Sequence, residues 1–194
     1  YLSPNVSTSS RGVFAFNTDG TGITSWIPTN GSGWDLQMTR GLSWAGDDLY
    51  VASRQNNNVY KFHASGDPLT ATFEATVNSA SMAGPQGLLV LGGTNLYSFG
   101  SSGAVYKIDL TAALPTAPVL VANVSGKMIM GAAYVKTNIY FLTYNSSPSS
   151  HGQIYRINSD NSTTLVIKDV GLTGTTAGLC VMDIEQVLPI LSIQ

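Results

Sequence analysis

The stretch Gly41–Gly66, with the sequence GLSWAGDDLYVASRQNNNVYKFHASG, decides the fold of this chain. Short runs of apolar, aromatic and β-branched residues alternate in it with clusters of Gly, Asp, Asn and Ser, which is typical of β-strands joined by turns. Side chains within each run are expected to point alternately to opposite sides, as a pleated strand requires. The stretch therefore predicts three strands, at Leu42–Ala45, Leu49–Ser53 and Val59–His63.

The same pattern recurs along the chain as an internal repeat with a period in the mid-forties. A glycine opens the first strand of each copy, at Gly41, Gly87, Gly131 and Gly178. A weaker fourth strand follows the three strong ones, at Gly22–Ile27, Ala71–Val77, Pro118–Ala122 and Thr164–Lys168. Four strands at this period indicate a β-propeller blade, and no segment has the sustained helical periodicity that a helical solenoid needs.

We predict an all-β fold, a β-propeller of four-stranded antiparallel blades. Residues 1–10 form an N-terminal flank, and residues 11–194 form one propeller domain. Residues 11–40 supply only third and fourth strands, whereas residues 178–194 supply only first and second strands. Joining these two segments would complete a last blade and close a ring of four blades, sealed by strands from both termini, which leaves no free sheet edge. The alternative is that the chain is part of a larger propeller.

The central copy also resembles a known family, the NHL-repeat propellers. The resemblance rests on a Gly-Leu opening at Gly41, a second strand of sequence DDLYVA, and the segment NNNVYKF that ends at Phe62. In that family an Asn before the third strand and an aromatic residue at its end recur, and here they correspond to Asn57 or Asn58 and to Phe62. The family includes scaffolds, receptors, lyases and esterases, so the resemblance implies an architecture and carries no catalytic motif.

Composition narrows the classes of partner. The chain has 194 residues, of which 10% are charged, and a formal net charge of -2. This balance gives no electrostatic reason to expect nucleic acid or an anionic membrane as a partner. No apolar run is long enough to span a membrane. The single cysteine, Cys180, permits no internal disulfide and is interpreted as a buried apolar residue.

Five Asn-x-Ser/Thr sequons bear on the cellular compartment in which the chain is located. Each falls in an expected loop or flank, where an attached glycan would reach solvent. The candidate glycosylation sites are Asn5, Asn30, Asn123, Asn145 and Asn161. A chain rich in Asn, Ser and Thr produces some sequons by chance, but five favour a secreted, extracellular glycoprotein.

The longest loops are expected on one face of the propeller, where a rigid scaffold usually carries its binding residues. The richest is Gly33–Arg40, with Arg54 in another loop of that face. Trp34 could stack on a sugar ring while Asp35 and Arg40 bond its hydroxyl groups, so Trp34, Asp35, Arg40 and Arg54 are candidate ligand-binding residues. The alternative is structural: Trp34 packs beneath its loop and Asp35 forms an ion pair with Arg40.

Catalytic and metal chemistry is not favoured by the sequence. The expected innermost strands contain no carboxylate and no histidine, so a central cation would lack ligands. His63 and His151 have no ligand spacing to another His or Cys and are expected at the surface. We therefore predict no metal site, no cofactor and no catalytic residues. The recurring tyrosines Tyr50, Tyr60, Tyr97, Tyr106, Tyr140 and Tyr155 are interpreted as core, as are Trp26 and Trp44.

These observations favour a secreted, glycosylated propeller that acts as a structural or interaction module of an extracellular assembly such as a fibre, matrix or adhesion complex. Its partners would be other protein subunits or extracellular glycans, and a homo-oligomer or filament is compatible with the low charge. One alternative is a carbohydrate- or peptide-binding propeller that uses the loops around Trp34. A second alternative is an NHL-like lyase or hydrolase.

Overall fold

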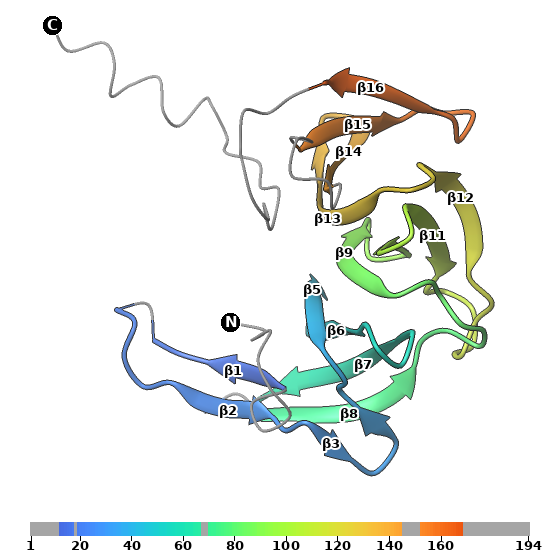
Figure 1. Cartoon of the computed structure of the whole chain (residues 1–194). Coiled ribbons are helices and arrows are strands. Elements are labelled where there is room, and N and C mark those ends of the chain that lie inside the picture. The colour runs from blue at the N-terminus through green and yellow to red at the C-terminus, as the bar shows by residue number, and fades with distance from the viewer. Residues whose placement is uncertain (1–11, 18, 67–69, 145–151, 169–194) are drawn as a thin grey trace, which may run out of the picture.

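The computed structural model describes residues 12–17, 19–66, 70–144 and 152–168, and all of its regular structure is β. Three four-stranded antiparallel sheets follow one another along the chain (Figure 1). Blade I contains β5 (Thr39–Ala45), β6 (Asp48–Ser53), β7 (Asn58–Ser65) and β8 (Thr70–Thr76). Blade II contains β9 (Pro85–Leu91), β10 (Asn95–Gly100), β11 (Ala104–Asp109) and β12 (Val119–Asn123). Blade III contains β13 (Met128–Val135), β14 (Asn138–Tyr144), β15 (Gln153–Ile157) and β16 (Thr163–Ile167).

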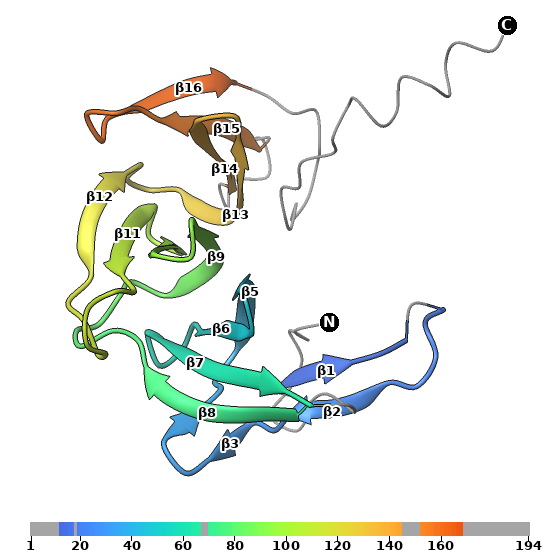
Figure 2. The same cartoon turned by 180° about the vertical axis from the view of Figure 1, so that it is seen from behind.

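Two strand pairs precede blade I. The N-terminal pair is β1 (Val13–Ala15) with β2 (Thr24–Ile27), and a small hairpin follows, formed by β3 (Asn30–Gly31) and β4 (Trp34–Asp35). Figures 1 and 2 show the N-terminal pair and the three blades in succession around an arc, with β5, β9 and β13 on the inner side and β8, β12 and β16 outermost. The predicted β-propeller of four-stranded antiparallel blades is confirmed.

The repeat glycines lie in the innermost strands because these strands approach one another closely. A Cβ atom on Gly41 of β5 would lie 2.8 Å from the Gln86 carbonyl oxygen and 2.8 Å from the Leu88 amide nitrogen of β9. A Cβ atom on Gly87 would lie 3.5 Å from the Cα atom of Gly131 in β13. At Gly41 only a residue without a side chain allows such an approach of two backbones, whereas the contact at Gly87 is an ordinary van der Waals distance.

Apolar side chains fill the spaces between consecutive sheets. Tyr50, Ala52 and Val59 of blade I pack with Leu88 and Leu96 of blade II. A second cluster joins blades II and III, and a third joins the N-terminal pair to blade I. Because strand residues alternate between the two faces, blades I and II each contribute to the core on both of their sides.

The predicted aromatic core is confirmed in part. Tyr50 and Tyr60 are buried, with 3% and 4% of their surface exposed, whereas Tyr97, Tyr106, Tyr140 and Tyr155 are half-buried. Trp26 is half-buried and stacks on Trp44, with 5.9 Å between ring centroids. Trp44 remains 37% exposed, so its expected place in the core is wrong. It lies near the end of β5, where one side of the stacked pair faces solvent.

Two turns, β1 to β2 and β15 to β16, share the same hydrogen bonds. Asn17 Nδ2 donates to Thr21 Oγ1, and Asn158 Nδ2 donates to Ser162 Oγ. In both turns the first Asn also donates its backbone N–H to the carbonyl oxygen of the fifth residue. The turn that joins β1 to β2 therefore has the geometry of the turn that joins β15 to β16. This identity supports β1 and β2 as third and fourth strands of a blade.

Closure of the ring stays a prediction. Residues 169–194, which include Gly178 and Cys180, lie outside the described residues, and so do the flank 1–10 and His151. Within the described residues β1 pairs only with β2.

Candidate functional site

The long loops meet on one face, which we call the long-loop face. It comprises the connections 28–38, 77–84 and 124–127, which lead into the innermost strands, and the loops 54–57 and 101–103. Backbone hydrogen bonds join them: the Arg54 amide donates to the Met38 carbonyl, the Met82 amide to the Asn57 carbonyl, and the Val124 amide to the Gly103 carbonyl. The loops thus form a continuous surface at the ends of the blades.

Trp34 packs within this surface. Its ring contacts Phe62 edge-on, with 5.5 Å between centroids, and contacts Phe73 at 5.4 Å. Its indole Nε1 donates to the Pro28 carbonyl oxygen at 3.3 Å. Gly33 lies against Phe73 as well, since a Cβ atom there would lie 2.5 Å from that ring. These contacts match the structural alternative for Trp34, and a sugar that stacks on this ring would have to displace them.

Asp35 is held by a neighbour other than Arg40. Both oxygens of its carboxylate accept from Gln37 Nε2, at 2.8 and 3.0 Å, and its carbonyl oxygen accepts from Asn56 Nδ2 at 2.7 Å. The predicted Asp35–Arg40 ion pair is therefore wrong. The reason is local: Gln37 lies two residues away, and the tight hairpin β3–β4 turns its amide onto the carboxylate.

Arg40 and Arg54 lie near each other without an acidic partner among the described residues. Thr39 pairs with Ser53 across the antiparallel strands β5 and β6; Arg40 continues β5 from this pair, and Arg54 begins the loop after β6. Burial lowers the pKa of the Arg40 guanidinium, and the positive charge of Arg54 lowers it further. The Nε atom of Arg40 is inaccessible to solvent and has no hydrogen-bond partner. Two of the four sequence-predicted site residues thus form a local cationic pair.

A cavity of about 440 Å³ opens beside Arg54 on the same face. Gln55, Asn57 and Ser101 contribute polar atoms to its wall, and Met38, Ala83 and Gly84 complete the lining. The cavity lies between blades I and II, because its lining residues come from the loops of both. The sequence indicated the loops but not this junction, since it depends on how the two blades pack.

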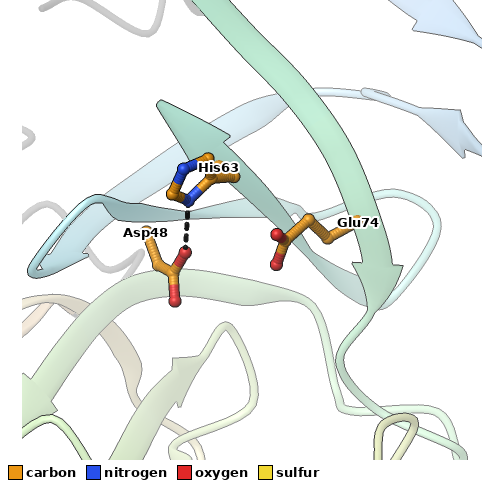
Figure 3. A group of neighbouring side chains, drawn as sticks. All are labelled: Asp48, His63 and Glu74. Atoms are coloured by element: carbon orange, nitrogen blue, oxygen red, sulfur yellow. Dashed lines mark hydrogen bonds and ion pairs between the residues drawn. The ribbon is translucent and has the colours of Figure 1, made fainter. Parts of the chain in front are cut away.

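A second group of ionisable side chains lies in blade I, away from the predicted site (Figure 3). Asp48 of β6, His63 of β7 and Glu74 of β8 offer ligand atoms that all lie within 4.8 Å of one another. His63 Nδ1 lies 3.2 Å from Asp48 Oδ1. No sequence motif marks this group, because its members lie on three different strands and meet only through cross-strand pairing. His63, expected at the surface, is half-buried.

Lys61 already supplies the cation of this group. Its Nζ atom lies 2.8 Å from Asp48 Oδ2 and 2.7 Å from Glu74 Oε2. Burial opposes the lysine charge, but hydrogen bonds to both carboxylates outweigh it, so the pKa of Lys61 is raised. A metal ion at this position would have to displace the ammonium group and recruit the same carboxylates. The arrangement is that of a cross-strand ion network.

A larger cleft, of about 650 Å³, lies between blades II and III on the opposite face. Tyr97, Tyr134, Asn138, Arg156 and Asn158 line it. Burial raises the pKa of Tyr97, and the nearby Tyr134 adds to this shift. The phenol of Tyr97 is therefore protonated at neutral pH and can donate a hydrogen bond at the wall of the cleft.

Three of the predicted glycosylation sites can be located. Asn30 lies in β3 and Asn123 ends β12, both on the long-loop face, whereas Asn161 lies in the turn between β15 and β16 on the opposite face. All three side chains are exposed, as a glycan acceptor requires. Asn5 and Asn145 lie outside the described residues.

Comparisons with known proteins support the fold and leave the family open. No protein-family model matches the chain, and no curated protein matches it. The predicted NHL-repeat family is therefore not confirmed.

Solved structures do match. A crystal structure of a protein of unknown function from Bacteroides thetaiotaomicron VPI-5482 aligns with a TM-score of 0.58 at 17% identity, over 77% of this chain and 37% of that chain. The β-propeller domain of Cps50 (Swd1) from Myceliophteria thermophila aligns with a TM-score of 0.49 at 15% identity, over 75% of this chain and 47% of that chain. The computationally designed Ika8 protein aligns with a TM-score of 0.46 at 13% identity, over 88% of this chain and 49% of that chain. The chain thus spans about half or less of the length of each, and at these identities the likeness concerns the fold alone.

Proposed function

We propose that this chain is a secreted, glycosylated β-propeller that acts as a protein-interaction module in an extracellular assembly of subunits. The observation that carries the proposal is the apolar character of the outermost strands of two consecutive blades. Exposed apolar side chains gather on β12 and on β16, at Val119, Leu120, Leu165, Val166 and Ile167.

The exposure pattern identifies these strands as open edges. Successive residues of a strand point to opposite faces, yet Val119 is 61% exposed and Leu120 is 53% exposed. Both faces of β12 are thus open to solvent at this point. Within the described residues β12 pairs only with β11, and β16 only with β15, so each keeps one row of unpaired backbone groups. An apolar strand with an unpaired edge is suited to pairing with another chain.

The positions of the sequons support the extracellular part of the proposal. Asn30, Asn123 and Asn161 are solvent-exposed in loops or at a strand end. Their glycans would add the solubility that few charged side chains provide. None of the described residues forms a helix long and apolar enough to cross a membrane.

Enzymatic function finds less support. The described innermost strands β5, β9 and β13 contain no carboxylate and no histidine. The carboxylates of Asp48 and Glu74 are bridged by Lys61, and the group adjoins none of the cavities described above. A sugar-binding role centred on Trp34 would need the packing of that ring to open, whereas a peptide-binding role on the same face remains compatible with the cavity beside Arg54.

The test is the native mass of the full chain, purified from its secreting source, before and after enzymatic removal of N-glycans. We expect a mass above that of one subunit and a decrease on deglycosylation. Leu120→Lys and Val166→Lys place charges on the apolar edges and should reduce the assembly to single subunits. Thr72→Lys, at an exposed position of the outermost strand β8, is the matched control and should leave the assembly intact. A single, unglycosylated subunit at every concentration would refute the proposal.

A further inference from the structure

Two hydrogen-bond donors without acceptors lie at the start of the innermost strands of blades I and II, next to the long-loop face. Arg40 of β5 and Gln86 of β9 each stand directly before a repeat glycine, so they occupy equivalent positions in consecutive blades. The two positions adjoin, because Gly41 lies against the Gln86 carbonyl oxygen. Figure 1 shows β5 and β9 facing each other on the inner side of the arc.

Each of these two side chains has a buried N–H group without a partner among the described residues. The atoms are Nε of Arg40 and Nε2 of Gln86, and the Gln86 residue is only 4% exposed. Buried polar groups are almost always hydrogen-bonded in folded proteins, because an unsatisfied one loses its bonds to water without replacement. Two unsatisfied donors at equivalent positions raise the positive potential at the start of these two strands.

The charge at this place indicates an anionic acceptor. Arg54 lies beside Arg40, and its charge disfavours the charged form of Arg40. The ion pairs found among the described residues involve Lys61 and His63, so neither arginine has a carboxylate within 4.0 Å there. Two neighbouring guanidinium groups without a counter-charge form a positive site on a chain whose net charge is -2.

Arg54 gives this site an opening with room for a side chain, whereas Arg40 and Gln86 are not among the residues that line the cavity. Arg54 lines the cavity of about 440 Å³, together with Asn57 and Ser101. Ala83 and Gly84, which precede Gln86, form another part of its wall. Guanidinium groups bind carboxylates through paired hydrogen bonds, and a desolvated position strengthens these bonds.

We propose that Arg54 binds a carboxylate that an acidic segment of a partner protein inserts into this cavity, with the positive charge of the neighbouring Arg40 strengthening the attraction. This inference rests on the proposed function as an interaction module and specifies the chemistry of the partner. The acidic segment would then bind the long-loop face, and the apolar outermost strands would remain free to pair with other subunits. Asn57 and Ser101 are available to bond the peptide that carries the carboxylate.

The test uses the full chain and a fluorescent hexaglutamate peptide as the probe, with binding followed by anisotropy. A hexaglutamine peptide controls for charge, and an oligosaccharide of uronic acids tests the other source of carboxylates. We expect saturable binding of hexaglutamate and weaker binding of both other probes. Arg54→Gln should lower the affinity by about ten- to hundred-fold, the usual effect of losing a hydrogen bond to a charged group. Arg40→Gln removes only a neighbouring charge and should lower the affinity by a smaller factor.

Two further variants separate binding from folding. Arg156→Gln, on the opposite face, is the matched arginine control and should bind hexaglutamate like the parent chain. Arg54→Lys keeps the charge but loses the planar pair of donors, so its affinity should lie between those of the parent chain and Arg54→Gln. Arg54→Gln should fold at least as stably as the parent chain, because it removes repulsion between two cations.

Specific outcomes would overturn the inference. These are equal binding of hexaglutamine, tighter binding of the uronic-acid oligosaccharide, or the same loss of affinity in Arg156→Gln as in Arg54→Gln. Absence of hexaglutamate binding by a chain whose native mass shows assembly would overturn the carboxylate site alone and leave the interaction module in place.

Discussion

Tyr50 illustrates at the scale of one residue how this propeller is held together. It stands in the middle of β6, and its side chain fills the space between blades I and II with 3% of its surface exposed. Burial raises the pKa of its phenol, an effect that Asp48 and Glu74 reinforce and Lys61 opposes. The sequence predicted its burial correctly, because an aromatic residue that recurs at the repeat period is what packing between blades requires.

Replacing Tyr50 with alanine should therefore lower the free energy of unfolding by about 3–5 kcal/mol, the usual cost of emptying a large aromatic site. Tyr134→Ala is the control, because that side chain is 44% exposed and its loss should cost less than about 1 kcal/mol. Urea denaturation of both variants provides the measurement. A loss below about 1 kcal/mol for Tyr50→Ala would show that the ring contributes little to the junction of the blades.

At the scale of one element, the turn between β15 and β16 shows that local sequence dictates local structure. Asp160 accepts hydrogen bonds from the Ser162 hydroxyl at 2.6 Å and from the Ser162 amide at 3.0 Å. Asp19 and Asp109 make the same pair of contacts with Thr21 and Thr111. Asn161 has a positive φ of 64°, and Gly20 takes the same place in the first turn with a φ of 82°. Short-range hydrogen bonds of this kind form independently of the rest of the blade.

The turn should make stability depend on pH. Hydrogen bonds from the Ser162 hydroxyl and then from its amide lower the pKa of Asp160 below the ordinary value of 3.8. The folded state thus binds the proton less readily than the unfolded state, so the contribution to stability is present above about pH 4 and is lost as pH falls through the folded-state pKa. Ser162→Ala should be less stable than the parent chain at pH 6, and the difference should shrink toward pH 3.

Urea denaturation at the two pH values checks this prediction for the turn. Ser159→Ala, a change at an exposed serine of the same turn, is the control and should follow the parent chain at both pH values. A difference between Ser162→Ala and the parent chain that stays constant between pH 6 and pH 3 would contradict the assignment of the effect to Asp160.

At the scale of the whole molecule, closure of the ring depends on which strand pairs with the free edge of β1. The matching turns identify β1 and β2 as third and fourth strands, and the repeat assigns first and second strands to residues 178–194. Aligned with blade I, Phe14 corresponds to Tyr60, whose cross-strand partner is Val51. The equivalent of Val51 in the last copy is Leu188. Ring closure therefore predicts that Phe14 and Leu188 face each other.

Engineered cysteines can test that pairing. In a Cys180→Ser background, Phe14→Cys with Leu188→Cys should form an intramolecular disulfide under mild oxidation, seen by mass spectrometry of the denatured chain. Phe14→Cys with Val187→Cys is the control, because neighbouring strand residues point to opposite faces. Free thiols in both variants would favour the alternative, in which the chain is part of a larger propeller.

The sequence by itself determined the class of fold and the blade repeat. Alternation of side chains, turn residues and the recurring glycines are local or periodic signals, and each blade folds largely from such signals. The strands match their predicted positions closely, as with β6 at Asp48–Ser53 against the predicted Leu49–Ser53. The sequence also indicated the long-loop face and named both arginines there.

Only the tertiary structure decided which side chains meet. Asp35 bonds to Gln37 and leaves Arg40 without an acid, because the hairpin β3–β4 fixes the loop. Asp48, Lys61 and Glu74 come together across three strands, and Gly41 meets the Gln86 carbonyl oxygen through the contact between β5 and β9. Such contacts depend on strand register and on the packing of one blade against the next, and neither is a property of any single stretch of sequence.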